Sequence, residues 1–311
     1  MVRGLRGALV EAFSDEPLGG NGAAVVLLEQ AASAQWMQRL AGRLQQSETA
    51  FLLPLEGESW GLRWFTPTQE VKLCGHATLA AVLALGSWGA ISPGETMTFA
   101  TRSGPLRVSL LTIPGASPDN PAPMAWIELP KLPLTPVQVA PELMGLLTER
   151  LNHPPLRGWT STLGYEVALL QPTAPLAQLE GLETAISGPA RQGLVLMQAL
   201  GPDSARKVAG EKADYQLRFF APGLGIAEDS VTGSAHALVA PFWMENLHRS
   251  RVVGWQCSDR PGGMVCEASS SAMIRLTGAG HLLWEGTLWA EPGQWSEQSQ
   301  ALDEWQRACA A

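Results

Sequence analysis

The chain has 311 residues, of which 46% are hydrophobic and 16% charged, and its formal net charge is -8. This composition is typical of a soluble globular protein and excludes an intrinsically disordered chain. The acidic balance, with no basic stretch to offset it, argues against a nucleic acid or an anionic membrane surface as partner. A small anionic substrate remains compatible with it, because the N-terminus of a helix attracts an anion locally whatever the net charge.

The sequence offers no segment that would target or anchor the chain. The longest mostly apolar run, residues 77–90, is shorter than the roughly 18 residues that span a bilayer. Glu11 and Asp15 interrupt any apolar stretch behind the N-terminal arginines, so no secretory signal is expected. The four cysteines are scattered without CxxC spacing, which is typical of reduced thiols. We therefore expect a cytoplasmic protein with no membrane contact.

Short apolar runs predict strands along the whole chain. In order they cover residues 7–13, 23–28, 49–53, 62–65, 97–100, 106–111, 126–129, 166–170, 194–198 and 216–220, with further strands near Val252, Met264 and Met273 and at 281–289. Helices are predicted at 33–45 with Ser33 as N-cap, at 75–88, at 141–151, from Ser234 onward, and at 296–309. Short strands with few intervening helices favour an α+β fold in which antiparallel sheet dominates.

The length suits two domains of roughly 150 residues each. The Pro-rich stretch 114–123 is the best candidate for a linker. We predict an N-terminal domain at residues 1–115 and a C-terminal domain at 124–295. A final helix at 296–311 is expected to pack back on the N-terminal domain.

One pattern occurs twice. Residues 62–67 read Leu-Arg-Trp-Phe-Thr-Pro and residues 217–222 read Leu-Arg-Phe-Phe-Ala-Pro, and each is followed by a loop and a small-residue helix, near Gly75 and Gly233. This repeat predicts two related domains that face each other across a cleft, with both helix N-termini aimed into it. Unpaired N–H groups and the helix dipole at such a site grip a carboxylate without an arginine.

Several motifs together carry a family resemblance. They are Gly20-Asn21, Ser-Glu-Thr-Ala-Phe at 47–51, Arg-Trp-Phe-Thr-Pro at 63–67, Leu-Cys-Gly-His-Ala-Thr-Leu-Ala at 73–80, and Glu-Asp-Ser-Val-Thr-Gly-Ser-Ala-His at 228–236. In this order, over almost the whole chain, they resemble the phenazine-biosynthesis PhzF-like isomerase family. The resemblance implies a diaminopimelate-epimerase-like fold: two similar domains, each a curved antiparallel, barrel-like sheet around a central helix, related by a pseudo-twofold internal repeat. It also implies a homodimer that uses no cofactor.

Glu48 stands between Ser47 and Thr49 at the start of an apolar strand. Taken alone, the tripeptide favours a capping or loop glutamate. In a buried cleft, however, loss of solvation would raise the pKa of its carboxyl and suit a group that takes a proton and returns it. The resemblance implies the second role: Glu48 falls on the general acid/base that moves a proton between carbons of a small unsaturated acid.

The remaining candidates also have plain structural readings, since His76 sits inside a helix start and Asp229 and Ser234 resemble N-caps. The resemblance implies that His76 and Asp229 act in catalysis, His76 by orienting substrate or relaying protons and Asp229 by bonding a substrate amino or hydroxyl group. Ser234 is expected to help hold the carboxylate. The other residues expected to bind substrate are Asn21, Gly75, Ala77 and Gly233. The pair Ser230-Val231 departs from the Pro-Ala that the family often has.

Cys74 stands where related epimerases and racemases carry one of two thiols. The corresponding second segment, 229–234, has no cysteine, so a two-thiol mechanism is disfavoured and Cys74 is expected to be a buried, inert thiol. The sequence has no GxSxG, HExxH, GxGxxG or P-loop motif, which argues against a serine nucleophile, a metal and a nucleotide cofactor. His153, His248 and His281 are predicted to be surface residues.

These observations predict a cofactor-independent isomerase that moves a proton within a small carboxylate-bearing metabolite through Glu48. Two alternatives stay open: a racemase or epimerase with a single base, and a small-acid binding protein without turnover.

Overall fold

The computed structural model describes residues 4–56, 59–111, 122–186, 192–290 and 298–309, which form two compact units. Unit 1 comprises Met1–Glu128 together with Thr277–Ala311, and unit 2 comprises Leu129–Leu276. This division differs from the predicted boundaries, because the last strand, β19 (Met273–Leu288), passes out of unit 2 and pairs with the first strand of unit 1. Most of the predicted linker at 114–123 lies outside the described residues.

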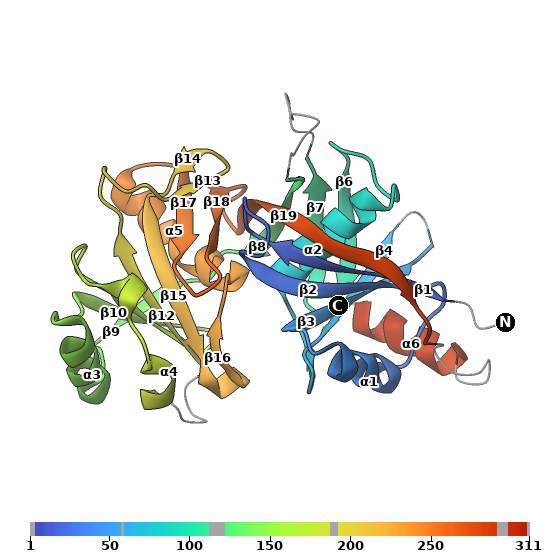
Figure 1. Cartoon of the computed structure of the whole chain (residues 1–311), viewed down its shortest axis with the longest axis horizontal. Coiled ribbons are helices and arrows are strands. Elements are labelled where there is room, and N and C mark those ends of the chain that lie inside the picture. Colours follow the sequence, from blue (N-terminus) through green and yellow to red (C-terminus); the bar gives the residue numbers. More distant parts are fainter. Residues whose placement is uncertain (1–3, 57–58, 112–121, 187–191, 291–297, 310–311) are drawn as a thin grey trace. The chain divides into compact units, whose positions relative to one another are not determined.

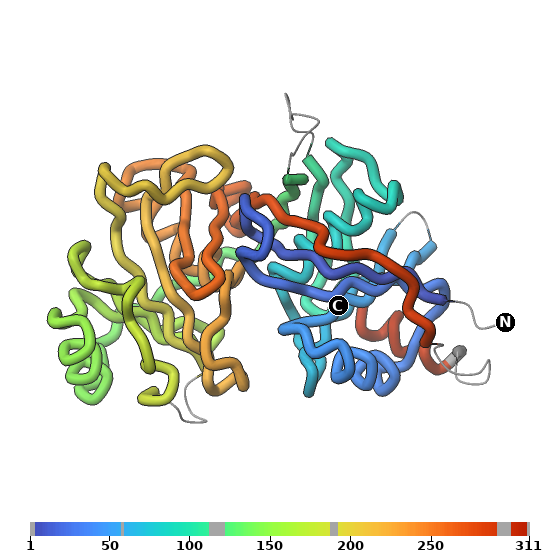
Figure 2. Tube along the Cα trace, viewed as in Figure 1, coloured from blue at the N-terminus to red at the C-terminus, as the bar shows by residue number. Residues whose placement is uncertain are grey.

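Unit 1 is a closed barrel. Its strands are β1 (Leu5–Ala12), β2 (Asn21–Leu27), β3 (Glu48–Pro54), β4 (Trp60–Phe65), β6 (Thr96–Thr101), β7 (Gly104–Leu110), β8 (Met124–Pro130) and β19. They pair in the order β1-β2-β3-β4-β6-β7-β8-β19, and β19 returns to pair with β1, so the ring has no open edge. In Figure 2 the β1 and β19 traces, blue and red, run side by side.

The barrel of unit 1 encloses α2 (Gly75–Ser87), of which every residue from Gly75 to Leu85 is buried. A helix that is apolar all round is stable only when other elements surround it, and here the barrel wall does so. The helices α1 (Ala34–Leu44) and α6 (Gln298–Cys309) lie outside the barrel and share an apolar cluster with it that includes Phe51, Phe65 and Trp305. Among the described residues, no helix combines the length and hydropathy needed to cross a membrane.

Unit 2 also has a curved sheet and a largely buried central helix, α5 (Gly233–Leu247) (Figure 1). Its main strands are β9 (Leu134–Val137), β10 (Arg157–Ser161), β11 (Tyr165–Leu169), β12 (Gly193–Ala199), β15 (Tyr215–Ala221), β17 (Arg251–Gln256) and β18 (Gly262–Ala268), paired in that order. The other elements are α3 (Pro141–Leu151), α4 (Leu182–Ala185), the short helices at Leu176–Gln178 and Pro222–Leu224, a hairpin of β13 (Lys207–Val208) and β14 (Glu211–Lys212), and β16 (Ile226–Asp229).

The internal repeat is visible in the strand pairing. In unit 1 the parallel pairs are β2–β3 and β4–β6, with α1 and α2 as their crossovers. In unit 2 the parallel pairs are β11–β12 and β15–β17, and the second of these has α5 as its crossover. The other strand pairs described above are antiparallel. The predicted α+β class with curved, mainly antiparallel sheets is therefore confirmed, with parallel pairs where a crossover intervenes.

The arginine of each repeat motif makes the same ion pair. Arg63 on β4 donates to Glu70 on β5 (Glu70–Val71) at 2.7 and 2.9 Å, and Arg218 on β15 donates to Glu228 on β16 at 2.7 and 2.5 Å. Both guanidiniums are buried and both carboxylates half-buried, and a bidentate pair gives such a cation two charge-assisted hydrogen bonds. The Leu-Arg-aromatic-Phe pattern therefore serves to fix the short strand that leads into each central helix.

Two sequence expectations change in detail. The strands predicted near Met273 and at 281–289 form one continuous strand, β19. His281, predicted to lie on the surface, is buried because it stands opposite Glu11 in the β1–β19 pairing. The predicted cap of α1 is confirmed, since the backbone N–H of Trp36 donates to the Ser33 hydroxyl at 3.3 Å.

Two glycines of unit 2 differ in the space that an added methyl group would find. A Cβ at Gly254 would lie 2.4 Å from His236 Nδ1 and 2.5 Å from the Tyr215 hydroxyl, whereas one at Gly145, exposed within α3, would meet nothing. We expect Gly254→Ala to destabilise the protein by about 1–3 kcal/mol. Gly145→Ala should stabilise it by about 0.5–1 kcal/mol, because alanine is the better helix former. Urea unfolding measures both, and equal effects would contradict the expectation.

Candidate active site

In unit 1 the fold gathers three predicted residues at one end of the barrel. Asn21 begins β2 and Glu48 begins β3, and the parallel register Ala23↔Glu48 sets both at the same edge of the sheet. His76 is the second residue of α2, whose N-terminus lies at that edge. All three side chains are buried.

Hydrogen bonds hold the His76 ring on both sides. Its Nε2 lies 3.0 Å from Glu48 Oε2 and 3.1 Å from the Ser47 hydroxyl, and its Nδ1 lies 3.2 Å from Asn21 Nδ2. Ser47 in turn donates to the backbone carbonyl of Gly22 at 2.8 Å. The carboxylate–imidazole contact is an ion pair, and Glu48 Oε2 makes no aligned hydrogen bond to a described residue. This arrangement fixes the ring and sets Glu48 Oε2 against its Nε2.

The electrostatics of the pair run against the sequence expectation. Burial raises the pKa of the Glu48 carboxyl, as expected, but the charge and hydrogen bond of His76 outweigh burial and bring this pKa below its ordinary value. Burial lowers the pKa of His76, but Cys74 and Glu48 together raise it well above its ordinary value. Because burial and Glu48 raise the pKa of the Cys74 thiol, that group stays neutral. The carboxylate of Glu48 is therefore the charge that favours the protonated form of His76, whereas the Asn21 amide N–H, 3.2 Å from Nδ1, can donate only to the neutral ring.

The ion pair predicts how stability depends on pH. The Glu48 contribution is fully present above its ordinary pKa of 4.5 and is lost as the pH falls through its lowered folded pKa. The His76 contribution is fully present below its ordinary pKa of 6.5 and is lost as the pH rises through its raised folded pKa. We expect the wild type to have the higher free energy of unfolding, and its difference from His76→Gln to be largest between pH 4.5 and 6.5. A difference independent of pH, measured by urea unfolding, would contradict the ion pair.

Cys74 belongs to this cluster. It is buried, as predicted, and its Sγ lies 3.5 Å from His76 Nδ1. Donor atoms of Glu48, Cys74 and His76 all lie within 4.8 Å of one another, which makes them a donor set that a soft divalent cation could use. The same atoms contact one another directly. Ser47 and Cys74 were not among the predicted site residues, although each directly precedes one, Glu48 and Gly75.

The start of α2 leaves its first backbone N–H groups without a side-chain cap. Cys74 is the N-cap residue and makes no capping bond, and Gly75, His76 and Ala77 form the buried first turn. Uncapped N–H groups at a helix start bind an anion through hydrogen bonds and the helix dipole. The substrate contacts of Gly75 and Ala77 stay predictions, and the uncapped N-terminus of α2 is compatible with them.

In unit 2 the equivalent helix start carries the other predicted residues. Asp229 ends β16, and Gly233 and Ser234 are the first two residues of α5. Thr232, the N-cap residue, uses its hydroxyl to donate to Asp229 Oδ2 at 2.6 Å and so leaves α5 uncapped. The Tyr165 hydroxyl lies 3.5 Å from Ser234 Oγ, a contact that no sequence pattern indicated, because Tyr165 is distant in the chain.

The repeat relates the two helix starts position by position: Gly75 matches Gly233 and His76 matches Ser234. Unit 2 therefore has no imidazole at the position of His76. Its nearby histidine, His236, is fully buried with Nδ1 2.9 Å from the Tyr215 hydroxyl, and burial lowers its pKa to about 3. His236 is therefore a neutral core residue.

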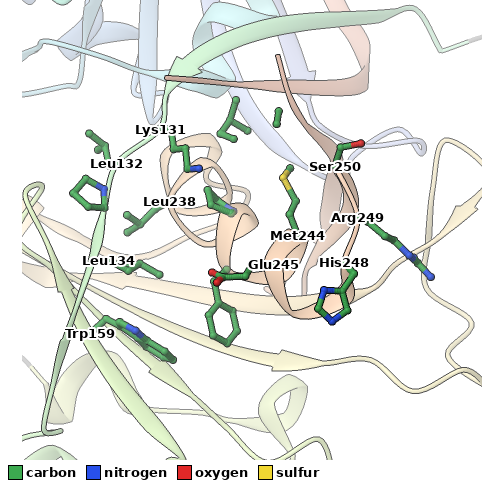
Figure 3. Close-up of a pocket in the computed structure, with 15 residues that line it drawn as sticks. Lys131, Leu132, Leu134, Trp159, Leu238, Met244, Glu245, His248, Arg249 and Ser250 are labelled. Atoms are coloured by element: carbon green, nitrogen blue, oxygen red, sulfur yellow. The ribbon is translucent and has the colours of Figure 1, made fainter. Parts of the chain in front are cut away.

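A pocket of about 700 Å³ lies elsewhere in unit 2 (Figure 3). It adjoins the C-terminal half of α5, from Leu238 to Glu245, and Trp159 and Lys131 lie on its other sides. None of the predicted site residues lines it, and α5 starts with Gly233 and Ser234 at the opposite end. This pocket therefore does not coincide with the predicted site residues, whereas one end of the unit 1 barrel brings Glu48 and His76 together.

Comparison with known proteins shows the family and the fold of the chain. The chain matches the PhzC-PhzF family, described as "Phenazine biosynthesis-like protein", over residues 10–286. The chain belongs to the PhzC-PhzF family. The match spans both helix starts, so the family assignment rests on most of the chain, and the resemblance predicted from the motifs is confirmed.

Individual proteins also match the chain along its length. A Pseudomonas aeruginosa protein named as an uncharacterized isomerase is 35% identical over 278 residues, covering 88% of this chain and 93% of its own. A crystal structure of an Enterococcus faecalis PhzF-family protein has a TM-score of 0.76 at 29% identity and covers 91% of this chain and 98% of its own. The fold extends to a hydroxyproline epimerase of Agrobacterium vitis, with a TM-score of 0.59 at 13% identity over 99% of both chains.

Proposed function

We propose that this chain is a cofactor-independent isomerase that moves a proton within a small carboxylate-bearing metabolite. The observation that carries the proposal is the buried ion pair of Glu48 and His76 beside the uncapped N-terminus of α2. Proton transfer at carbon is catalysed by a buried acid–base pair that lies next to a site for the substrate anion. The isomerase name of a relative that is 35% identical supports it.

Glu48 is proposed to remove the proton and to return it. The resting pair lowers the pKa of its carboxyl, which favours the ionised form that acts as a base, and Oε2 is the oxygen that lies 3.0 Å from His76 Nε2. His76, whose pKa the same pair raises, is proposed to donate toward the negative charge that develops as the C–H bond breaks. Since burial excludes water, the proton stays on Glu48 until it is delivered to a second carbon.

The substrate carboxylate is proposed to bind at uncapped helix N–H groups. Gly75 and Ala77 at the start of α2, and Gly233 and Ser234 at the start of α5, supply them, with Asn21 as a further polar contact. Asp229 is proposed to accept a hydrogen bond from an amino or hydroxyl group of the substrate. We further propose that both motifs serve one substrate, that water is excluded by domain closure, and that the active form is a cytoplasmic homodimer.

An epimerase with Glu48 as its single base is the second candidate. The observation that favours it is the likeness of the fold to a hydroxyproline epimerase. A two-thiol version is disfavoured, because the N-cap position filled by Cys74 in unit 1 is filled by Thr232 in unit 2. The two candidates differ in product: an isomerase returns the proton to another carbon, whereas an epimerase returns it to the opposite face of the same carbon.

A hydrogen-exchange screen tests the proposal. The protein is incubated in deuterated water with L-proline, trans-4-hydroxy-L-proline and a panel of unsaturated, amino and hydroxy carboxylic acids. Mass spectrometry then locates incorporated deuterium, and chiral chromatography detects inversion. We expect label at carbon in at least one acid with wild type and none with Glu48→Gln. Binding of panel acids without exchange in any of them would overturn both candidates and identify a binding protein.

A further inference from the structure

A buried glutamine braces the loop that carries Asp229. Gln256, the last residue of β17, is fully buried. Its Nε2 donates to the backbone carbonyl of Asp229 at 2.6 Å and to the Thr232 hydroxyl at 3.3 Å, and its Oε1 accepts from the backbone N–H of Thr232 at 2.8 Å. One amide group therefore joins the two ends of the segment between β16 and α5.

The bonds form a directed chain that ends on the carboxylate. Because Oε1 accepts from an N–H and Nε2 donates to a carbonyl, the Gln256 amide has one orientation. The Thr232 hydroxyl accepts a hydrogen bond from Gln256 and donates its own to Asp229 Oδ2 at 2.6 Å. The direction and position of the Asp229 carboxylate thus depend on a residue that is 27 positions away.

Gln256 itself belongs to strand β17 and not to the loop that it contacts. Gln256 stands opposite Leu217 in the parallel β15–β17 pairing, and the next residue, Cys257, donates its N–H to the Leu217 carbonyl at 3.1 Å. On the outer side of the loop, Ser258 donates to the Ser230 carbonyl at 2.7 Å and Arg260 donates to the Ser230 hydroxyl at 2.9 Å. Ser230, which departs from the common family residue, thus adds a second tie to the same strand end.

We propose that Gln256 is a positioning residue for substrate binding, which sets the Asp229 carboxylate and the uncapped start of α5 through Thr232. This inference rests on the proposed role of Asp229 in binding the substrate. Without the amide, the Thr232 N–H and the Asp229 carbonyl lose their buried partner, and the Thr232 hydroxyl is free to turn away from Asp229. The loop then samples several conformations, and the binding geometry is held only part of the time.

The experiment compares Gln256→Met with a matched control, Gln198→Met. Methionine keeps the length of the side chain and removes its hydrogen bonds. Gln198 on β12 is also buried, and its Nε2 donates to the carbonyls of Gln171, Pro172 and Ala174, away from the Asp229 loop. Amide hydrogen exchange by mass spectrometry is followed in the peptide that covers residues 226–240. KM and kcat are measured with the acid that wild type labels fastest.

We expect amides of the Asp229–Ser234 loop to exchange at least about tenfold faster in Gln256→Met and unchanged in Gln198→Met. KM should rise about tenfold or more, with a smaller change in kcat, because Gln256 does not touch the reacting atoms. Unchanged loop exchange, or equal acceleration in both variants, would overturn the proposal. Faster loop exchange with an unaltered KM would also overturn it. Since amide exchange needs no substrate, it separates failure of this inference from failure of the proposed isomerase.

Discussion

Glu48→Gln is expected to lower the rate of substrate deuteration, and the kcat of conversion, by about 10²- to 10⁴-fold, the usual contribution of a general acid–base group. Glutamine keeps the size and shape of the side chain but can neither accept nor return a proton. The variant should still bind the acid, because the helix N–H groups that are proposed to hold the carboxylate are intact. Exchange rates by mass spectrometry and affinity by calorimetry measure the two effects separately.

The matched control is Glu128→Gln, another buried glutamate of unit 1, which pairs with Arg107 at 3.1 Å outside the Glu48–His76 cluster. It should leave the exchange rate unchanged. NMR titration supplies a readout without substrate: Glu48→Gln should lower the pKa of His76, since the carboxylate that raises it is gone. Retained exchange in Glu48→Gln, or a His76 pKa that does not fall, would show that this pair is not the catalytic unit.

Trp305→Ala is expected to destabilise unit 1 by about 3–5 kcal/mol, the usual cost of removing a large aromatic side chain from a core. Trp305 on α6 is fully buried, and its indole N–H donates to the Ala32 carbonyl at 2.9 Å. Its ring lies under the Arg63 guanidinium, with 5.4 Å from the guanidinium carbon to the ring centroid. The variant would open a cavity and leave the Ala32 carbonyl without this partner. Urea unfolding measures the loss.

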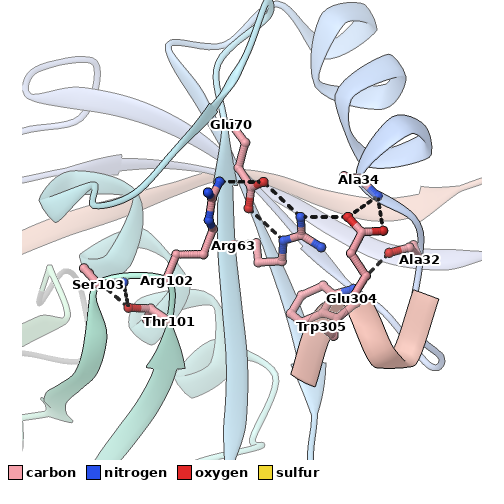
Figure 4. Close-up of polar contacts among 9 residues, drawn as sticks. All are labelled: Ala32, Ala34, Arg63, Glu70, Thr101, Arg102, Ser103, Glu304 and Trp305. Carbon is pink, nitrogen blue, oxygen red and sulfur yellow. Dashed lines mark hydrogen bonds and ion pairs between the residues drawn. The ribbon is translucent and has the colours of Figure 1, made fainter. Parts of the chain in front are cut away.

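The neighbouring residue explains why α6 matters to the rest of unit 1. Figure 4 shows Glu304 bonded both to Arg63, at 3.2 Å, and to the backbone N–H of Ala34, at 3.3 Å. The helix thus ties the first turn of α1 to the buried Arg63–Glu70 pair. Trp289→Ala is the control, because Trp289 is 74% exposed and its loss should change stability by no more than about 0.5 kcal/mol. Similar losses in both variants would mean that α6 does not form part of the core.

Much of the site could be predicted because its residues lie in short continuous segments. Glu48 begins a strand, Asp229 ends one, and His76 is the second residue of a helix, and each lies close to glycines or hydroxyl residues. Such element ends can be predicted from sequence. Cys74 was predicted to be a buried thiol, but its contact with His76 was not predicted. Ser47 and Tyr165 were missed as contact residues, since nothing local separates a contact residue from a core or capping residue. Gln256 was missed for a stronger reason: its partners are 24 and 27 positions away.

The sequence by itself determined the α+β class, the repeat and the positions of α2 and α5, because hydrophobic periodicity and the glycine at each helix start are local properties. Only the tertiary structure decided the direction of the Glu48 pKa, since burial alone predicts a rise and the 3.0 Å contact with His76 reverses it. The tertiary structure also decided that residues 277–288 belong to unit 1, because this part of β19 pairs with β1 and closes the barrel of unit 1. Long-range pairing and Coulomb interactions depend on distances in space, and no local pattern records them.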